Sequence, residues 1–314
     1  GPRAAPALGL SGRALVPMGG GKDSLVALER LRATGAEIET VQVGEASLIR
    51  RVAARTGLPH RMIRRRLPAG LARLNERGAL NGHVPITAIN AAVLVVAALA
   101  WKFDRVVFAN ERSADSPTLV APDGREINHQ YAKSLDFEAA FDERVRADVA
   151  ADLAVFSLLR RDRELGVCRE FAGLERYHDV FSSCNRNFHL DGARTERWCR
   201  ECPKCRFVYL ALAPFLPPGR LRAIFGADLL DDAASVDGFA ALLELDGHRP
   251  FECVGEAVEA RSALAALSED TRWSGHAVVR ALAPRLESVD VPDLAALVEP
   301  GGPHRIPDDL LDAA

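Results

Sequence analysis

Strand-like and helix-like patterns alternate along the first third of the chain. Residues 14–18 form a short apolar run, and Leu25, Leu28 and Leu31 then recur at helical spacing. The alternation continues with predicted strands at residues 37–43, 60–63 and 105–109 and predicted helices at residues 46–56 and 88–101. Short apolar runs are typical of strands that are buried on both faces. Their alternation with helices predicts an α/β fold built on a doubly wound parallel sheet.

The pattern changes after Pro214. Residues 221–230, 238–245 and 257–286 have amphipathic helical spacing and are separated by segments that contain proline or glycine. We therefore predict an α/β domain at residues 1–216 and a C-terminal helical subdomain at residues 217–314. The last stretch, residues 298–314, contains several prolines and glycines and is predicted to be a loosely docked end.

Composition and charge exclude some functions. The chain has 314 residues, of which 48% are hydrophobic, and its formal net charge is −3. Its most apolar stretch, residues 91–101, is shorter than the roughly 20 residues that a bilayer-spanning helix needs, so no membrane association is predicted. The charge gives no general footprint for nucleic acid, and the cluster of Arg61 with residues 64–66 is interpreted as a solvated strand edge. The N-terminal residues lack the order of a signal peptide, which predicts a cytoplasmic protein.

The sequence PMGGGKDSLV, residues 17–26, joins the first predicted strand to the first predicted helix. Glycines let a backbone approach a ligand closely, and the N–H groups at a helix N-terminus favour an anion. The segment is therefore either a phosphate-binding loop or a tight packing turn. It matches neither the GxGxxG fingerprint nor the ending of a Walker loop.

The residues after the glycines resemble the SGGxDS pyrophosphate loop of the adenine nucleotide alpha-hydrolase group, with Gly19 in place of the first serine. Enzymes with this loop cleave ATP between its α and β phosphates. The resemblance implies that ATP is held by Gly19, Gly20, Gly21, Lys22, Asp23 and Ser24, and that Asp23 helps to place Mg²⁺. It also implies that Gly44, after the second predicted strand, meets the adenine.

Polar residues follow the predicted strand at residues 105–109. Parallel sheets bind ligands at the carboxyl ends of their strands, so Asn110 and Glu111 are predicted to lie beside the glycine loop. Glu111 is either an exposed loop acid or a catalytic or metal-binding acid at a strand end.

Four cysteines, Cys184, Cys199, Cys202 and Cys205, form the spacing C-x14-C-x2-C-x2-C. This spacing lets neighbouring thiolates point at one ion, and disulfides are a poor alternative without a secretory signal. A structural zinc site, an iron–sulfur cluster and unligated cysteines remain open, in that order of preference. The arrangement is similar to the zinc site of 7-cyano-7-deazaguanine synthase, which has the same ATP loop. Cys168 and Cys253 are interpreted as buried small hydrophobes.

Five further segments together resemble the UDP-N-acetylmuramoyl-L-alanyl-L-glutamate epimerases. They are NGHVPITAINA (81–91), FANERSAD (108–115), INHQYAKSLDFE (127–138), WCRECPKCRF (198–207) and RPFECVGE (249–256). The resemblance implies an enzyme of peptidoglycan precursor synthesis that inverts the terminal L-Glu of its UDP-linked dipeptide substrate to D-Glu. It implies ATP, Mg²⁺ and structural Zn²⁺ as cofactors, with AMP and diphosphate as products, and leaves the oligomeric state open.

The chemistry of inversion explains a requirement for ATP. A carboxylate makes the neighbouring α C–H a very weak acid, because loss of the proton places a second negative charge beside the first. Adenylation of the carboxyl group removes this charge, after which a proton can be taken from one face and returned to the other.

Residue roles follow from the same resemblance. It implies Asp23, Glu111, His83 and Lys133 as catalytic residues and Asn110, Arg112, His129 and Tyr131 as substrate-binding residues. His83 has an alternative interpretation as a loop histidine, and Lys133 as a group that neutralises a phosphate or carboxylate. Arg112 is a similar partner for the γ-carboxylate.

Two other functions remain open. One is another ATP-dependent ligase or nucleoside-modifying enzyme with this loop, similar to 7-cyano-7-deazaguanine synthase. The other is a zinc-stabilised binding module with an inactive ATP loop, which only the replacement at Gly19 suggests.

Overall fold

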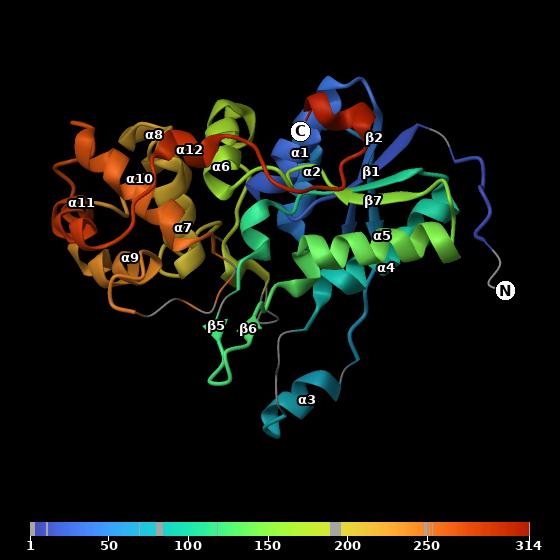
Figure 1. Ribbon diagram of the computed structural model, residues 1–314, viewed down its shortest axis with the longest axis horizontal. Coiled ribbons are helices and arrows are strands. Elements are labelled where there is room, and N and C mark those ends of the chain that lie inside the picture. Colours follow the sequence, from blue (N-terminus) through green and yellow to red (C-terminus); the bar gives the residue numbers. More distant parts are fainter. Residues whose placement is uncertain are drawn as a thin grey trace.

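The computed structural model describes residues 4–10, 12–68, 70–79, 84–117, 119–188, 196–247, 250, 252 and 254–313. His83 and Cys253, each assigned a role from sequence, lie outside the described residues. Figure 1 shows an α/β layer beside a cluster of helices, with the C-terminal segment returning from the helices to the sheet.

The central sheet contains five parallel strands in the order β3-β2-β1-β4-β7. These are β1 (Arg13–Pro17), β2 (Glu37–Val43), β3 (His60–Ile63), β4 (Arg105–Phe108) and β7 (Ala154–Ser157). β1 pairs with β2 from Arg13 opposite Glu37 to Pro17 opposite Val41. The chain first adds strands on one side of β1 and later returns to its other side, so the strand order reverses between β1 and β4. This topology confirms the predicted doubly wound parallel sheet.

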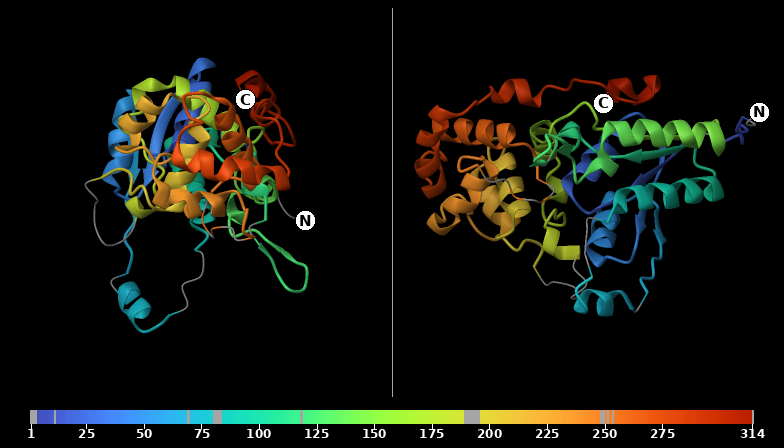
Figure 2. Two further views of the ribbon diagram at one scale, coloured as in Figure 1. Left: turned by 90° about the vertical axis from the view of Figure 1, so that its left-hand side faces the viewer. Right: turned by 60° about the horizontal axis from the view of Figure 1, so that its bottom comes forward.

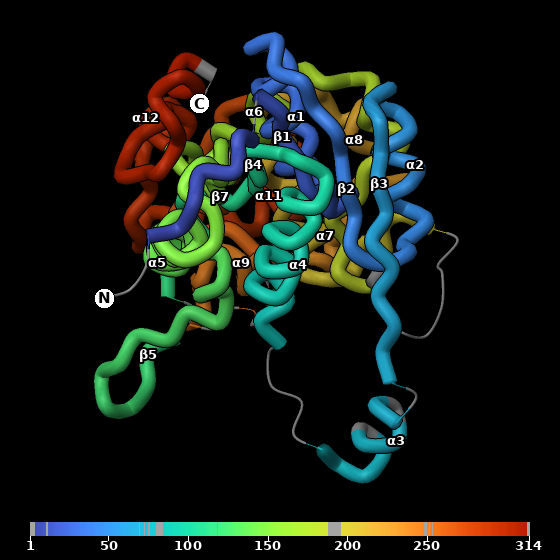
Figure 3. The backbone as a smooth tube through the Cα atoms, turned by 90° about the vertical axis from the view of Figure 1, so that its right-hand side faces the viewer, coloured from blue at the N-terminus to red at the C-terminus, as the bar shows by residue number. Residues whose placement is uncertain are grey.

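Helices cover both faces of the sheet (Figure 3). α1 (Lys22–Ala33) and α2 (Ser47–Thr56) lie on one face, and α4 (Ile86–Trp101) and α5 (Leu135–Asp148) lie on the other. Neighbouring residues of β1 divide between two hydrophobic cores: Val16 packs with the α1 side and Leu15 with the α4 side. Burial of both faces explains the apolar run in β1.

The predicted boundaries of the first elements lie close to the observed ones. β2 and β3 have the predicted limits, and α2 and α4 begin within two residues of theirs. The fifth strand, β7, was not predicted, although all four of its residues are buried. A strand of four residues surrounded by other apolar positions gives no period that distinguishes it from a helix.

Two small elements project from the sheet. The antiparallel hairpin of β5 (Leu119–Val120) and β6 (Glu126–Ile127) follows β4, and α3 (Gly70–Glu76) follows β3. Each lies apart from the two main layers in Figure 1, in Figure 3 and in the left-hand view of Figure 2. Neither contributes to the parallel sheet.

The helical part of the molecule contains α6 (Glu164–Gly173), α7 (Pro203–Leu212), α8 (Pro218–Phe225), α9 (Val236–Leu242), α10 (Ala257–Glu269), α11 (Ala277–Leu282) and α12 (Leu294–Val298). α7 packs against α6, α9 and α10, so helices on both sides of residue 216 share one hydrophobic core. A domain boundary at this residue remains a prediction.

The predicted helical segment at residues 257–286 is divided by a turn. Two N–H groups, of Trp273 and Ser274, donate to the carbonyl of Asp270 at 2.9 Å, and the Trp273 side chain is fully buried. Burial of this large ring fixes the turn between α10 and α11.

The prediction of a loosely docked C-terminal end is wrong. Ile306 and Leu310 are buried in the main core, and Asp309 forms an ion pair of 2.7 Å with Arg105 of β4. The short 3-10 segment η7 (Asp308–Ala313) packs against α1. Two apolar residues four positions apart therefore anchor a segment whose prolines and glycines suggested weak packing.

Within the described part of the chain, every helix is too short or too polar to cross a bilayer.

Candidate active site and metal centre

A cavity of about 80 Å³ opens at the point where the strand order of the sheet reverses. Four of the residues with predicted roles line it: Asp23, Asn110, Glu111 and Lys133. They come from the start of α1, the carboxyl end of β4 and the turn η2 (Tyr131–Lys133) before α5. The remaining lining includes two charged residues that sequence reasoning missed, Glu164 and Lys204. The fold therefore brings distant segments of the sequence to one site, as expected at a switch point.

The glycine loop packs closely against the segment that leads to the first cysteine. Gly20 has a φ of +82°, and its carbonyl accepts a hydrogen bond of 3.0 Å from the Ser182 N–H. A Cβ atom at Gly21 would lie 2.8 Å from the Ser183 hydroxyl oxygen, so a side chain there would force a shift. Gly21 is the N-cap of α1 and supplies no side-chain cap. The loop is thus a tight turn that also leaves helix N–H groups without a capping side chain.

Lys22 and Lys204 share one buried carboxylate. The Lys22 amine is fully buried and contacts both Asp23 and Glu164. The other oxygen of Glu164 accepts from the Lys204 amine at 3.1 Å. Burial would raise the pKa of Glu164, but Lys204 and Lys22 outweigh it and lower this pKa to about 2. The predicted nucleotide residue Lys22 is not part of the cavity lining but contacts two residues that are, Asp23 and Glu164.

Glu111 is buried, which excludes its interpretation as an exposed loop acid. One carboxyl oxygen accepts from the Ser113 N–H at 2.6 Å, and the other accepts from the Ser113 hydroxyl at 2.7 Å. Burial, followed by the charges of Glu164 and Glu259, raises the pKa of Glu111 to about 8. A carboxyl group with this pKa is protonated at neutral pH and is suited to proton transfer near it.

The raised pKa of Glu111 predicts a dependence of stability on pH. In the unfolded chain this group ionises near its ordinary value of 4.5, whereas in the folded chain it holds its proton to about 8. The unfolded state therefore binds fewer protons between these values. The free energy of unfolding should fall as pH rises through this window, by up to about 1.4 kcal/mol per pH unit for one proton.

Urea denaturation at a series of pH values measures this slope, and Glu111→Gln should reduce it. Part of the slope should remain, because burial and Glu164 raise the pKa of Glu259 to about 7. Glu164 acts in a different window: its stabilisation is present above about pH 4.5 and is lost as the pH falls toward 2. Identical slopes in the wild-type protein and the variant would contradict the assignment to Glu111.

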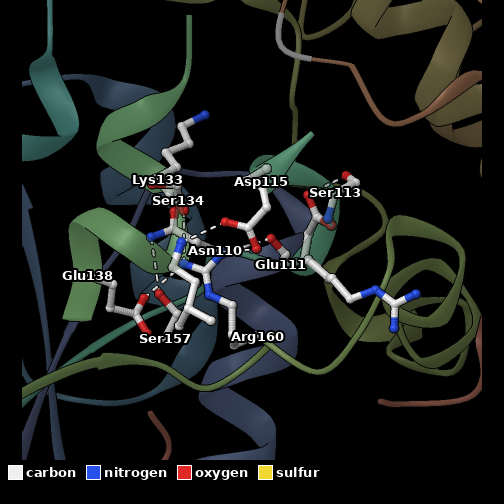
Figure 4. Close-up of polar contacts among 12 residues, drawn as sticks. Asn110, Glu111, Ser113, Asp115, Lys133, Ser134, Glu138, Ser157 and Arg160 are labelled. Carbon is white, nitrogen blue, oxygen red and sulfur yellow. Dashed lines mark hydrogen bonds and ion pairs between the residues drawn. The ribbon is translucent and has the colours of Figure 1, made fainter. Parts of the chain in front are cut away.

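A buried arginine holds the strand ends and the η2 turn together (Figure 4). Arg160 is fully buried and donates to the Glu111 carbonyl at 3.2 Å, the Lys133 carbonyl at 2.8 Å and the Glu138 carboxylate at 2.9 Å. Across the sheet, the Asn110 amide donates to the Ser157 hydroxyl at 3.1 Å. Arg160 follows the unpredicted strand β7, and for this reason sequence reasoning missed it.

Other residues with predicted roles lie outside the lining of the cavity. Arg112 donates to the Gly301 carbonyl at 3.3 Å and so contacts the C-terminal segment. Tyr131 is 55% exposed and makes an edge contact with Phe137, and its neighbour His129 is half-buried. Gly44 directly follows β2 with a φ of +102°, and its N–H donates to the Ile63 carbonyl at 2.8 Å.

The four predicted cysteine ligands form one cluster, which could hold a metal ion. Their sulfur atoms all lie within 4.8 Å of one another, with 4.0 Å between Cys184 and Cys202 and 3.7 Å between Cys199 and Cys205. A tetrahedral zinc ion with Zn–S bonds of 2.3 Å would separate its sulfurs by about 3.8 Å, so the cluster fits this geometry.

Local backbone structure positions these sulfurs. Cys202 is the N-cap of α7, and its sulfur accepts from the Cys205 N–H at 3.4 Å. The Cys199 sulfur likewise accepts from the Cys202 N–H at 3.3 Å. Cys168 is buried outside the cluster, as its interpretation as a small hydrophobe requires.

Comparison with known proteins agrees with this architecture. Residues 2–158 match the MurL N-terminal domain, and residues 180–296 match the MurL C-terminal domain. The chain is 52% identical over 309 residues to a UDP-N-acetyl-alpha-D-muramoyl-L-alanyl-L-glutamate epimerase of Xanthomonas oryzae pv. oryzae, a match covering 97% of this chain and 68% of that protein. It is 45% identical over 297 residues to the Micromonospora sp. protein of the same name, covering 94% of this chain and 66% of the relative.

Fold and site together define a doubly wound α/β protein with a charged cavity at its switch point and a four-cysteine candidate metal centre. The sequence matches identify its family. The chain belongs to the MurL family. It spans about two thirds of the length of the curated relatives it matches.

Proposed function

We propose that the chain is an ATP-dependent epimerase that inverts the terminal L-Glu of UDP-N-acetylmuramoyl-L-alanyl-L-glutamate to D-Glu. Three relatives, each at least 44% identical to this chain, are named as this epimerase, which supports the epimerase activity and the substrate. The observation that carries the catalytic proposal is the placement of Glu111, with its raised pKa, in one cavity with Asp23 and Lys133. Perturbed acids in a cleft at a switch point are suited to proton transfer.

ATP is proposed as the co-substrate that activates the α-carboxyl group of the glutamate. The glycine loop and the uncapped start of α1 would hold its phosphates, and Asp23 would place Mg²⁺. Transfer of AMP to the carboxylate removes the charge that opposes loss of the α proton. Diphosphate leaves, and water later releases AMP from the inverted product.

Glu111 and Lys133 are the proposed proton-transfer groups at the cavity. Lys133 lines the cavity from the η2 turn, where its amine donates to Gln130 at 2.9 Å, and Glu111 lines it from the end of β4. Because inversion takes a proton from one face and returns one to the other, it needs two groups on different sides of the α carbon. Two groups carried by different elements can meet this requirement.

Zinc is the proposed ion at the four-cysteine cluster, in a structural role. Four thiolates close a tetrahedral site and leave no position for a substrate. The sulfur separations of 3.7 and 4.0 Å support a single ion at this cluster.

The function is tested by incubating the chain with ATP, Mg²⁺ and the UDP-linked L-Ala-L-Glu precursor, with AMP and the stereochemistry of glutamate as readouts. We expect AMP and D-Glu product to form together. AMP formation with a nucleoside precursor alone would instead support the alternative similar to 7-cyano-7-deazaguanine synthase. Absence of nucleotide turnover with every precursor would instead support the other alternative, a zinc-stabilised binding module with an inactive ATP loop.

A further inference from the structure

The segment that carries the four cysteines also brings a lysine into the cavity. Lys204 lies between Cys202 and Cys205, in the first turn of α7. Its side chain is only 13% exposed, the residue lines the cavity with Asp23 and Glu111, and its amine donates to Glu164 at 3.1 Å. The backbone that wraps the sulfur atoms therefore sets the position of this cation.

A serine from the same segment lies at the glycine loop. Ser183 precedes the first cysteine, and its hydroxyl oxygen is buried without a hydrogen-bond partner among the described residues. The oxygen lies 2.8 Å from the position of a Cβ atom on Gly21, at the N-terminus of the twelve-residue helix α1. A buried hydroxyl without a hydrogen-bond partner is unfavourable, so a ligand group at the loop would form the hydrogen bond that the protein does not form.

Two lysine amines and two carboxylates meet at this point, but they are not paired one to one. Glu164 is shared between Lys22 and Lys204, and Lys22 is also paired with Asp23. Lys204 therefore has one shared carboxylate as its ion-pair partner and faces the cavity. A lysine amine in this position is suited to a phosphate group, which it binds as a compact point charge.

Resting on the proposed ATP-dependent function, we propose that Lys204 and Ser183 hold the phosphates of the nucleotide, and that the four-cysteine cluster positions both residues. Ser183 would supply a hydroxyl that the loop lacks at Gly19. The cluster would then serve ligand binding in addition to holding the fold together.

Calorimetric titration of the full chain with Mg²⁺–ATP, and separately with Mg²⁺–pyrophosphate, tests this assignment. Lys204→Met should weaken binding of both ligands about 10- to 100-fold, and Ser183→Ala about 2- to 10-fold. Metal content measured on the same samples should equal that of the wild-type protein. Lys102→Met, at an exposed position after α4, and Ser288→Ala, at an exposed hydroxyl, are matched controls that should bind like the wild-type protein.

A double variant separates ligand binding from a merely structural role. If Lys204 only neutralises Glu164, then Glu164→Gln combined with Lys204→Met should restore binding. If Lys204 contacts the ligand, the double variant should remain weak. Restored binding, or unchanged binding in both single variants, would overturn the inference.

The two proposals fail differently. A wild-type chain that binds ATP and forms AMP, with Lys204 and Ser183 variants that bind equally well, would refute this inference and leave the proposed function intact. A wild-type chain that binds neither ATP nor pyrophosphate would refute both.

Discussion

Asp23→Asn is expected to leave a folded protein in which AMP formation falls by at least about 10²–10³-fold. Asp23 is the second residue of α1, its side chain is 33% exposed, and it lines the cavity while contacting the Lys22 amine. An amide keeps the size of the carboxylate but cannot offer Mg²⁺ the same charge. Turnover of ATP to AMP, measured by chromatography at saturating precursor, reports the loss.

The chain provides a matched control for this change. Asp136 is the second residue of α5 and is exposed. Asp136→Asn therefore removes a charge from the same helix position away from the cavity, and it should keep wild-type turnover. Full turnover by Asp23→Asn would refute the assignment of the loop to nucleotide and magnesium.

Cys202→Ser is expected to lose about one metal ion per chain and to destabilise the fold by several kcal/mol, because thiolate ligation couples metal binding to folding. The residue is 4% exposed, caps α7 and contributes one of four clustered sulfurs. Elemental analysis of the purified protein gives the metal content, and thermal unfolding gives the loss of stability.

Cys168→Ser separates metal loss from the cost of burying a hydroxyl. Cys168 is fully buried but lies outside the four-sulfur cluster. Its replacement should lower stability without changing the metal content. Zinc-free wild-type protein, or a brown protein containing iron, would contradict the zinc assignment.

The first part of the sheet was predictable from sequence because each element has its own signal. β1 lies in a short apolar run, and after it the glycine loop and the spacing of Leu25, Leu28 and Leu31 indicate a turn and a helix. The rule that parallel sheets bind ligands at carboxyl strand ends then placed Asn110 and Glu111 correctly near Asp23. Local pattern and topology agree in this region.

The rest of the site depended on contacts between distant residues. Lys204 enters the cavity because the cysteine cluster folds against the glycine loop, and Glu164 enters it at the start of α6. No periodicity in the sequence marks either residue. Conversely, Arg112 has suitable chemistry in a family-like segment, but its guanidinium contacts the C-terminal segment. Residue type therefore indicated which chemistry a side chain could perform, but not which part of the structure the side chain contacts.

The local sequence also did not show which of these side chains are buried. Glu111 follows a strand and resembles a loop acid, yet the surrounding elements bury it and raise its pKa to about 8. In the C-terminal segment, the prolines and glycines suggested weak packing, yet Ile306 and Leu310 are both buried. Both outcomes depend on tertiary packing, which a local pattern does not contain.

The central claim is that ATP activates the glutamate carboxyl group so that its α proton can exchange. In deuterated water, the UDP-linked L-Ala-L-Glu precursor should gain deuterium at the glutamate α carbon only when ATP and Mg²⁺ are both present. ADP or an α,β-non-cleavable analogue should not replace ATP, and Glu111→Gln should slow exchange more than it weakens nucleotide binding. Deuterium incorporation without nucleotide would contradict the account, even if the inverted product formed.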